Sequence, residues 1–172
     1  MIKQTIGRLK TATKKITGSQ YDMLDMLRSD HMKVESMLIQ LRIARDADHR
    51  TRLLKTIRQD LEKHMRIEET IFYPACEKVQ KIHDLVEHSY DEHQKAKNML
   101  KDLQAMDPSN SRFSQMVTKL ITEIEHHVIN EEEEIFPAVR KYMEQREFNR
   151  LNRDVIDAFS TTTGKAKTRK AA

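Results

Sequence analysis

The chain has 172 residues, a length that suits one domain with short appendages, and 34% of its residues are charged. Three glycines and three prolines are too few for a β-sandwich or a β-barrel. No apolar run approaches the roughly 20 residues of a membrane span, and the N-terminus lacks the apolar core of a secretion signal. The single cysteine, Cys76, cannot form an internal disulfide. We therefore expect a cytoplasmic, all-α protein in a reducing compartment.

Charge is segregated along the chain, although the net charge is only +4. Residues 1–20 carry five basic and no acidic side chains, and residues 161–172 carry four basic and no acidic ones. The stretch between them has 22 basic and 27 acidic residues. We expect an acidic body with flexible basic tails at 1–19 and 160–172. These tails are either disordered, solubilising ends or segments that touch nucleic acid or an anionic surface.

Four segments in the body place apolar residues three and four positions apart, which is the spacing of a helix face and not of a strand. They cover residues 24–41, 57–75, 86–103 and 120–138. Short connections make consecutive helices antiparallel. The sequence therefore predicts an up-down-up-down four-helix bundle over residues 20–145.

Loop signals separate these segments. The stretch ARDADH at 44–49 ends the first, with Asp48 as the expected N-cap of the second. MDPSNS at 106–111 ends the third, whereas the junction near KVQKIHD at 78–84 is weakly marked. After the bundle, the apolar residues of 146–159 indicate a short C-terminal helix.

Six residues on the predicted inner faces are polar, and one of them begins a run of four glutamates. Successive helical residues turn by about 100°, so at least one of these four carboxylates must face the core. We predict that it is Glu131 and that Glu132, Glu133 and Glu134 lie in solvent or at the rim. A lone histidine on such a face is usually a hydrogen-bonded core residue, but six polar residues would be costly to bury without a partner. The six are His31, His64, Glu68, His93, His127 and Glu131.

The chain also repeats itself, which predicts two related helical hairpins. DHMKVESML at 30–38 matches EHQKAKNML at 92–100, and HMRIEETIFYPA at 64–75 matches HVINEEEEIFPA at 127–138. In both copies a histidine is followed by a glutamate four residues later and by a proline ten residues later. One H-x-x-x-E is weak evidence, but two copies with matching upstream histidines are a strong signal.

This spacing predicts a metal site. Residues i and i+4 lie on one helix face, so each histidine–glutamate pair can reach the same point inside the bundle. Four imidazoles and two carboxylates are too rich in nitrogen for magnesium or calcium and suit iron, manganese or zinc. Two opposed carboxylates suit the bridging of a metal pair.

With these residues in place, the chain resembles the hemerythrin-like proteins of the bacterial HHE cation-binding kind. The family pattern H…HxxxE…H…HxxxE is matched by the six residues named above, and the EETIFYPA and EEEEIFPA endings are also typical. The resemblance covers about residues 20–145. It implies two iron ions in a non-haem, oxo- or hydroxo-bridged centre. It also implies O₂ binding, NO or O₂ sensing, iron handling or peroxide breakdown.

The chain departs from the oxygen-carrying hemerythrins at one position. Those proteins have two histidines four residues apart on the third helix, but Ser89 and Lys97 stand four residues either side of His93 here. A site with one nitrogen fewer favours peroxide chemistry or redox and gas sensing over reversible O₂ carriage. A sensed signal would need a separate partner protein.

Other side chains near the six are weighed by helical geometry. Glu35, four residues after His31, is either an additional ligand or a rim carboxylate. His88, five before His93, could turn inward only through a π-bulge and is otherwise an exposed or outer histidine. We expect His49, His83 and His126 to be non-ligands.

Three functions follow from the sequence. The first is a di-iron protein that binds or reacts with O₂, NO or peroxide; catalase-like turnover fits it but is not required. The second is passive metal binding or iron storage without turnover. The third is a nucleic-acid-associated protein that uses its basic tails, which lack interleaved aromatic residues or a recognised binding motif.

Overall fold

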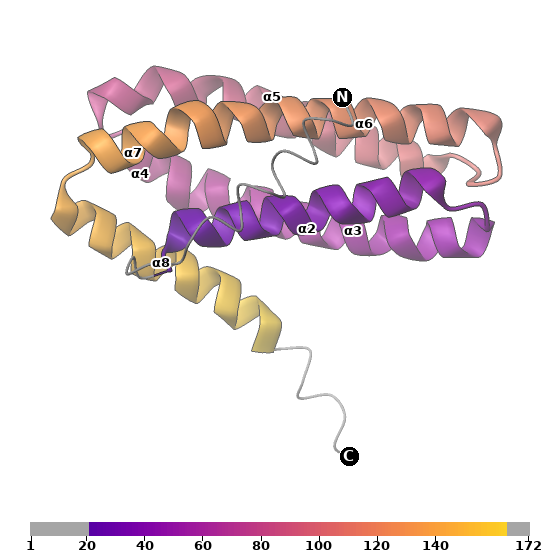
Figure 1. The fold of residues 1–172 in the computed structure, drawn as a ribbon, viewed down its shortest axis with the longest axis horizontal. Helices are drawn as coiled ribbons and strands as arrows, with labels where there is room; N and C mark the ends of the chain where they lie inside the picture. The colour runs from indigo at the N-terminus through magenta and orange to yellow at the C-terminus, as the bar shows by residue number, and fades with distance from the viewer. Residues whose placement is uncertain (1–20, 165–172) are drawn as a thin grey trace, which may run out of the picture.

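The computed structural model describes residues 21–164, and every regular element in this range is a helix (Figure 1). The basic residues before residue 21 and after residue 164 lie outside the described range. Two of the elements, labelled η, are π-helical turns inside longer helices. In chain order the elements are α2 (Met23–Ile43), α3 (Ala47–Ile67), η1 (Glu68–Phe72), α4 (Tyr73–Cys76), α5 (Gln80–Ala105), α6 (Ser111–Asn130), η2 (Glu131–Ile135), α7 (Phe136–Tyr142) and α8 (Gln145–Gly164).

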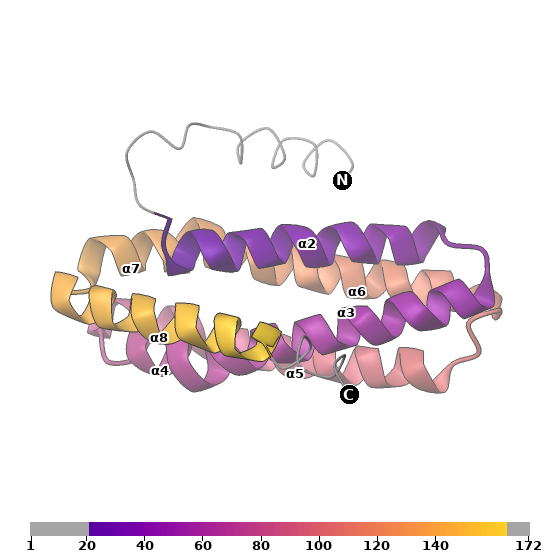
Figure 2. The ribbon, with the colours of Figure 1, turned by 90° about the horizontal axis from the view of Figure 1, so that it is seen from below.

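The helices form the predicted four-helix bundle. α2 packs against α3, and α5 packs against α6, so each half of the repeat is a hairpin. The hairpins meet through contacts of α2 with α6 and of α3 with α5. Figures 1 and 2 show these four helices lying side by side along the long axis of the molecule.

Side-chain caps set where the bundle helices begin. Asp22 caps α2 in a capping box with Asp25. The N-cap of α3 is Asp46, whose carboxylate accepts a hydrogen bond of 2.7 Å from the His49 N–H. The prediction of Asp48 as this cap was wrong, because Asp48 lies in the first helical turn. Asn110 caps α6.

The π-helical turns shift the inner face of two bundle helices. The Tyr73 N–H donates to the Glu68 carbonyl and the Phe136 N–H to the Glu131 carbonyl, each five residues earlier. A proline follows directly in both cases; it has no N–H and crowds the carbonyl four residues before it, so a wider turn relieves the clash. The extra residue changes which side chains are buried. Ile71 and Ala75, which continue the spacing of three and four residues after Glu68, are half-buried, whereas Phe72, Tyr73 and Cys76 are fully buried.

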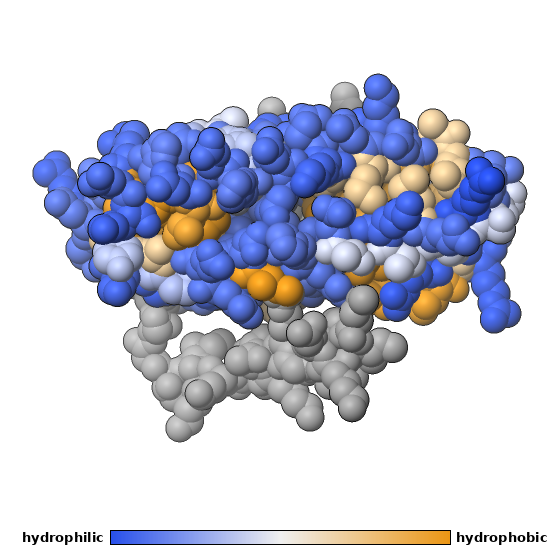
Figure 3. Space-filling model, turned by 90° about the horizontal axis from the view of Figure 1, so that it is seen from above, coloured by the Kyte–Doolittle hydropathy of each residue, from blue (hydrophilic) through white to orange (hydrophobic). Residues whose placement is uncertain are grey.

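The core consists of two hydrophobic clusters with a polar layer between them. One cluster contains Leu27, Phe72 and Phe136 and lies at the end formed by α4, α7 and α8. The other contains Val34, Leu61 and other residues toward the opposite end. On the outside, hydrophilic residues cover most of the face in Figure 3, and hydrophobic residues form separate small patches.

The C-terminal helix α8 is longer than the predicted range of 146–159, because it runs from Gln145 to Gly164. It turns back along the half of the bundle that holds α4 and α7 (Figures 1 and 2) and contacts α2, α3 and η1. Its Asn152 side chain accepts a hydrogen bond of 2.7 Å from the Met23 N–H. Within residues 21–164, none of the helices has both the length and the apolar character that crossing a membrane requires.

Candidate metal centre

All six predicted ligands meet in the polar layer between the two hydrophobic clusters. Glu68 and Glu131 have no exposed surface, and the four histidines are 1–5% exposed. Their donor atoms form two groups, each with all donor atoms within 4.8 Å of one another. The groups are His31, His64, Glu68 and Glu131, and Glu68, His93 and His127.

The outward-facing nitrogen of every one of these histidines is held by a carboxylate. Each Nδ1 atom lies 2.9–3.0 Å from a carboxylate oxygen. An ionised carboxylate only accepts hydrogen bonds, so each Nδ1 atom must donate. The partners are Glu132 for His31, Asp30 for His64, Glu69 for His93 and Glu92 for His127. This pattern leaves the four Nε2 atoms to face the centre.

These four carboxylates occupy equivalent positions in the two copies of the repeat, as the histidines do. Asp30 and Glu92 directly precede His31 and His93, and Glu69 and Glu132 directly follow the two buried glutamates. Each reaches a histidine on a different helix. Helical periodicity does not identify them as partners, although the repeated D/E-H and E-E pairs mark their positions. Carboxylate–histidine–metal arrangements of this kind fix the ring orientation and raise the basicity of the ligand.

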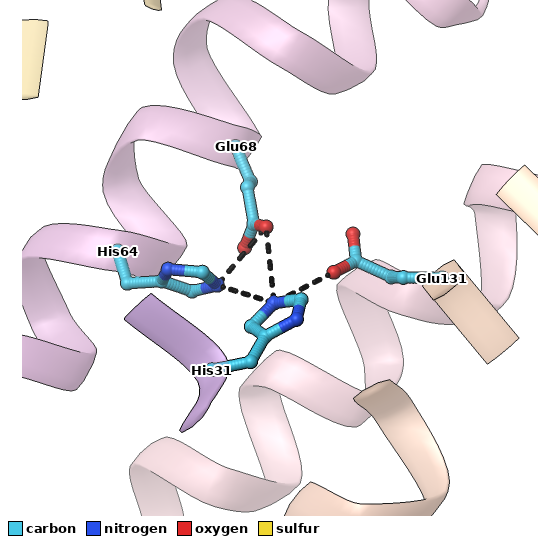
Figure 4. Close-up of side chains that lie close together, drawn as sticks. All are labelled: His31, His64, Glu68 and Glu131. Atoms are coloured by element: carbon cyan, nitrogen blue, oxygen red, sulfur yellow. Dashed lines mark hydrogen bonds and ion pairs between the residues drawn. The ribbon is translucent and has the colours of Figure 1, made fainter. Parts of the chain in front are cut away.

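The inner nitrogens and carboxylate oxygens converge as metal ligands do (Figure 4). The Nε2 atoms of His31 and His64 lie 3.1 Å apart, as do those of His93 and His127. Glu68 Oε1 is 3.0 Å from His64 Nε2, and its Oε2 is 3.4 Å from His93 Nε2, so this carboxylate faces both histidine pairs. Glu131 Oε2 likewise lies 3.1 Å from His31 Nε2 and 3.6 Å from His127 Nε2.

Three buried carboxylate oxygens in this layer show whether a cation fits the site. Glu68 Oε1, Glu68 Oε2 and Glu131 Oε2 have no hydrogen bond of good geometry. Buried carboxylate oxygens without donors are costly, and paired nitrogen lone pairs at 3.1 Å repel each other. Cations between these atoms would offset both costs, so the residues present fit a metal pair.

Protonation takes over part of this role when no metal is bound. Burial lowers the pKa of His31, but the neighbouring Glu131 and Glu132 carboxylates outweigh it and raise the pKa to about 9. Burial similarly disfavours charged His64, yet the Glu68 and Asp30 carboxylates hold its pKa well above the usual value. Burial raises the pKa of Glu68, but His64 and His93 outweigh it and hold the pKa well below normal. The cluster therefore attracts positive charge.

Tyr73 is a site residue that the helical periodicity of the sequence does not predict. Its hydroxyl donates a hydrogen bond of 2.8 Å to Glu131 Oε1 and lies 3.2 Å from His93 Nε2. Burial, followed by the charges of Glu131 and Glu68, raises the pKa of this hydroxyl well above normal. On a regular α-helix Tyr73 would point about 140° away from Glu68. The π-helical turn brings it back to the inner face.

The position of Tyr73 in the other repeat is Phe136, so the two halves of the centre differ. Phe136 stacks on His31 with ring centroids 6.1 Å apart and an interplanar angle of 9°. It has no hydroxyl to offer to Glu68, whose two oxygens both stay without hydrogen bonds. Glu131 therefore has one oxygen directed to the centre, and Glu68 has two.

A small cavity adjoins the centre on the side of the second hydrophobic cluster. It has a volume of about 10 Å³, about the space that one water molecule needs. All four histidines line it, together with apolar side chains such as Val34, Ala96 and Ile124. The cavity therefore has room for a water-sized ligand.

The remaining candidates lie outside the two donor groups. Glu35 is half-buried and His88 is exposed on α5, and neither belongs to a group. His49, His83 and His126 are exposed, and His126 contacts Glu92 at 2.8 Å. Lys97, which takes the place of Glu35 in the repeat, contacts both oxygens of Glu69 at 2.6 and 2.8 Å.

Two relatives share part of this sequence. A DNA nickase of Nostoc sp. is 28% identical over 145 residues, which are 84% of this chain and 39% of the relative. An uncharacterized hemerythrin-like protein of Schizosaccharomyces pombe is 29% identical over 125 residues, which are 72% of this chain and 62% of the relative. The chain thus spans less than two thirds of either protein.

A solved structure shares the fold. The crystal structure of a hemerythrin HHE cation binding domain-containing protein from Mycobacterium kansasii superposes with a TM-score of 0.68 at 18% identity. The superposition covers 88% of this chain and 96% of that one. The family model of the hemerythrin HHE cation binding domain matches residues 22–139, which include all six clustered residues. This match covers more than half of the 172-residue chain. The chain therefore belongs to the hemerythrin HHE cation-binding domain family.

Proposed function

We propose that this protein holds two iron ions and binds or reacts with O₂, NO or peroxide at them. His31 and His64 would hold one ion, His93 and His127 the other, and Glu68 and Glu131 would bridge the pair. The observation that carries the proposal is that each of these carboxylates faces both histidine pairs while three of their oxygens lack hydrogen bonds. Imidazole and carboxylate together are a ligand set that suits iron.

The surrounding residues support a reaction with a small molecule. When bound, iron would supply the redox chemistry and an electrophilic position for the ligand. The protein contributes fixed imidazole rings, because each Nδ1 atom is held by a carboxylate. It also contributes the small cavity beside the histidines, which excludes larger substrates.

Anaerobic addition of Fe(II), followed by air or hydrogen peroxide, tests this proposal. New visible absorption on oxidation is expected, and sustained O₂ evolution from peroxide would identify catalysis. A zinc-loaded sample serves as the control, because zinc has no redox chemistry. A protein that binds no iron, or whose iron gives no spectral change with either oxidant, would contradict the proposal.

Iron storage without turnover is the alternative that the same site supports. Buried imidazole and carboxylate ligands can hold iron whether or not the centre turns over a substrate. Visible absorption without O₂ evolution, and with no NO or azide adduct, would favour it over reactivity.

Nucleic-acid contact is a second candidate, because a relative is named a DNA nickase and the chain has basic ends. The test is retention of supercoiled plasmid and its conversion to the nicked form. Replacing Lys165, Lys167, Arg169 and Lys170 by glutamine should abolish retention if the C-terminal basic end carries it. Unchanged retention would assign the binding elsewhere, and no retention by the parent would exclude the candidate.

A further inference from the structure

An aromatic contact leads outward from the centre on one side. The Tyr73 hydroxyl donates to Glu131 and lies beside His93 Nε2. The ring centroids of Tyr73 and His93 are 5.4 Å apart. Tyr73 is therefore in direct contact with two residues that face the centre.

Tyr90 continues this contact toward the surface. Its ring packs edge-to-face on Tyr73 with centroids 5.2 Å apart, and its side chain is half-buried. Burial and, after it, the neighbouring Glu77 carboxylate raise the pKa of the Tyr90 hydroxyl to about 12. Two phenols in contact thus connect the buried centre with solvent, and each has a carboxylate beside its hydroxyl to take a proton.

The other half of the repeat lacks this arrangement. The residues equivalent to Tyr73 and Tyr90 are Phe136 and Arg28. Phe136 stacks on His31, and the Arg28 guanidinium lies 5.1 Å from the Phe136 ring centroid. Neither side chain can give up a hydrogen atom as a phenol can. The two halves of the repeat therefore differ chemically at these equivalent positions.

The composition makes this pair distinctive in the chain. The chain contains no tryptophan and four tyrosines. The other two, Tyr21 and Tyr142, are 54% and 42% exposed at the surface. Half of the tyrosines therefore form one contacting pair that begins at the centre.

We propose that Tyr73 and Tyr90 form a one-electron relay between the metal centre and a small reductant at the surface, so that the protein reduces peroxide at the expense of a phenolic donor. The relay rests on the proposed function, which provides iron and peroxide. The donor binds at the exposed edge of Tyr90, because a phenol cannot enter the small cavity beside the histidines.

The electrons and protons balance in this scheme. Tyr73 gives one electron to the oxidised centre while its proton passes along the hydrogen bond to Glu131. The Tyr73 radical then takes an electron from Tyr90, whose proton passes to Glu77. The proton held by Glu131 returns to the Tyr73 oxygen. A donor restores Tyr90 by losing one electron, and with it a proton to solvent, while Glu77 returns its proton to Tyr90. Two donors lose one hydrogen atom each per peroxide, and the peroxide becomes two water molecules by taking up the two electrons and two protons from solvent.

Freeze-quenched electron paramagnetic resonance of the iron-loaded full chain tests the relay after one equivalent of hydrogen peroxide. The parent should give a tyrosyl radical whose hyperfine pattern changes with ring-deuterated tyrosine. Tyr73→Phe should abolish this radical. Tyr90→Phe should leave a longer-lived radical at Tyr73 and lower guaiacol oxidation at least tenfold. Tyr21→Phe and Tyr142→Phe are the matched controls, and both should behave as the parent.

The outcomes separate the relay from the proposed function. Iron content and the visible spectrum are measured on the same samples, so misfolded or metal-free variants are recognised. No iron, or no spectral change with peroxide, would overturn the proposed function and the relay with it. A normal spectral change without a tyrosyl radical, or guaiacol oxidation by Tyr90→Phe at the parent rate, would overturn the relay alone. Glu77→Gln gives a second check, because it should slow guaiacol oxidation while leaving the Tyr73 radical in place.

Discussion

At the scale of single residues, each histidine of the centre depends on one carboxylate from another helix. The run of four glutamates shows how sharply neighbours differ. Glu131 is fully buried, Glu132 holds the His31 Nδ1 atom at 2.9 Å, and Glu133 and Glu134 are exposed. Only two residues of the run can therefore affect the centre directly.

This contrast predicts different effects of two adjacent substitutions. Glu132→Gln should weaken iron binding by about 10- to 100-fold, because His31 loses the acceptor that orients its ring and raises its basicity. Glu133→Gln removes the same charge one position later and should leave the affinity unchanged. Competition with a chelator of known affinity measures both. Equal affinities of the two variants would contradict the assigned role of Glu132.

The raised pKa of His31 predicts a pH dependence of the metal-free protein. The His31 pKa is about 9 in the folded state, compared with an ordinary value of 6.5. Protonated His31 therefore stabilises the folded state fully below pH 6.5. That contribution is lost as pH rises through 9. The melting temperature in excess chelator should therefore fall between pH 6.5 and 9, and His31→Gln should fall less. A melting temperature of the parent that stays level or rises across this window would contradict the assignment.

The sequence predicts the six central residues because the repeat places them at i and i+4 on inner faces. It does not predict Tyr73, because a regular helix directs this side chain about 140° away from Glu68 and only the π-helical turn returns it. Partners such as Asp30 and Glu92 were missed for a different reason. A residue adjacent to a histidine points about 100° away from it, so its partner depends on how the helices pack.

At the scale of elements, the structure differs from the prediction mainly at the two prolines and at the end of the last helix. Pro74 and Pro137 were recognised as part of the repeat, but periodicity gave no sign that each follows a π-helical turn. Helix α8 extends to Gly164, beyond the apolar residues from which it was predicted. The final turn of α8 is polar and shows no apolar periodicity, so the sequence did not predict where this helix ends.

Docking of α8 predicts a contribution to stability that is separate from metal binding. Leu151 is 4% exposed and packs in the first hydrophobic cluster. Leu151→Ala should cost about 2–5 kcal/mol of unfolding free energy. The exposed neighbour Arg153→Ala should change it by no more than about 0.5 kcal/mol. Denaturant unfolding of iron-loaded samples measures both, and a Leu151→Ala variant as stable as Arg153→Ala would show that α8 is not docked in solution.

At the scale of the whole molecule, the centre joins all four bundle helices between two hydrophobic clusters. α2, α3, α5 and α6 each contribute one histidine, and η1 and η2 contribute the glutamates. Without metal, these buried carboxylates face each other across the layer and depend on histidine protons for compensation. The overall bundle was predictable from the four periodic segments, because a strong helical period needs no knowledge of the partner helices.

Metal and fold should therefore be coupled. Each ion present at a hundredfold excess over its Kd stabilises the native state by about 2.7 kcal/mol. This corresponds to roughly 5 to 10 °C for a chain of this size. Calorimetry should show a lower melting temperature for the chelated protein, while magnesium, which prefers oxygen ligands, should not restore it. Identical melting temperatures with and without iron would indicate that the polar layer is solvated.

The number of iron ions per chain tests the central claim most directly. Elemental analysis of the reconstituted, desalted protein should give about two irons per chain, and His64→Ala and His127→Ala should each retain fewer. This result is expected because Glu68 and Glu131 each face both histidine pairs. A parent that retains no iron, or variants that retain as much as the parent, would contradict a di-iron centre at these residues.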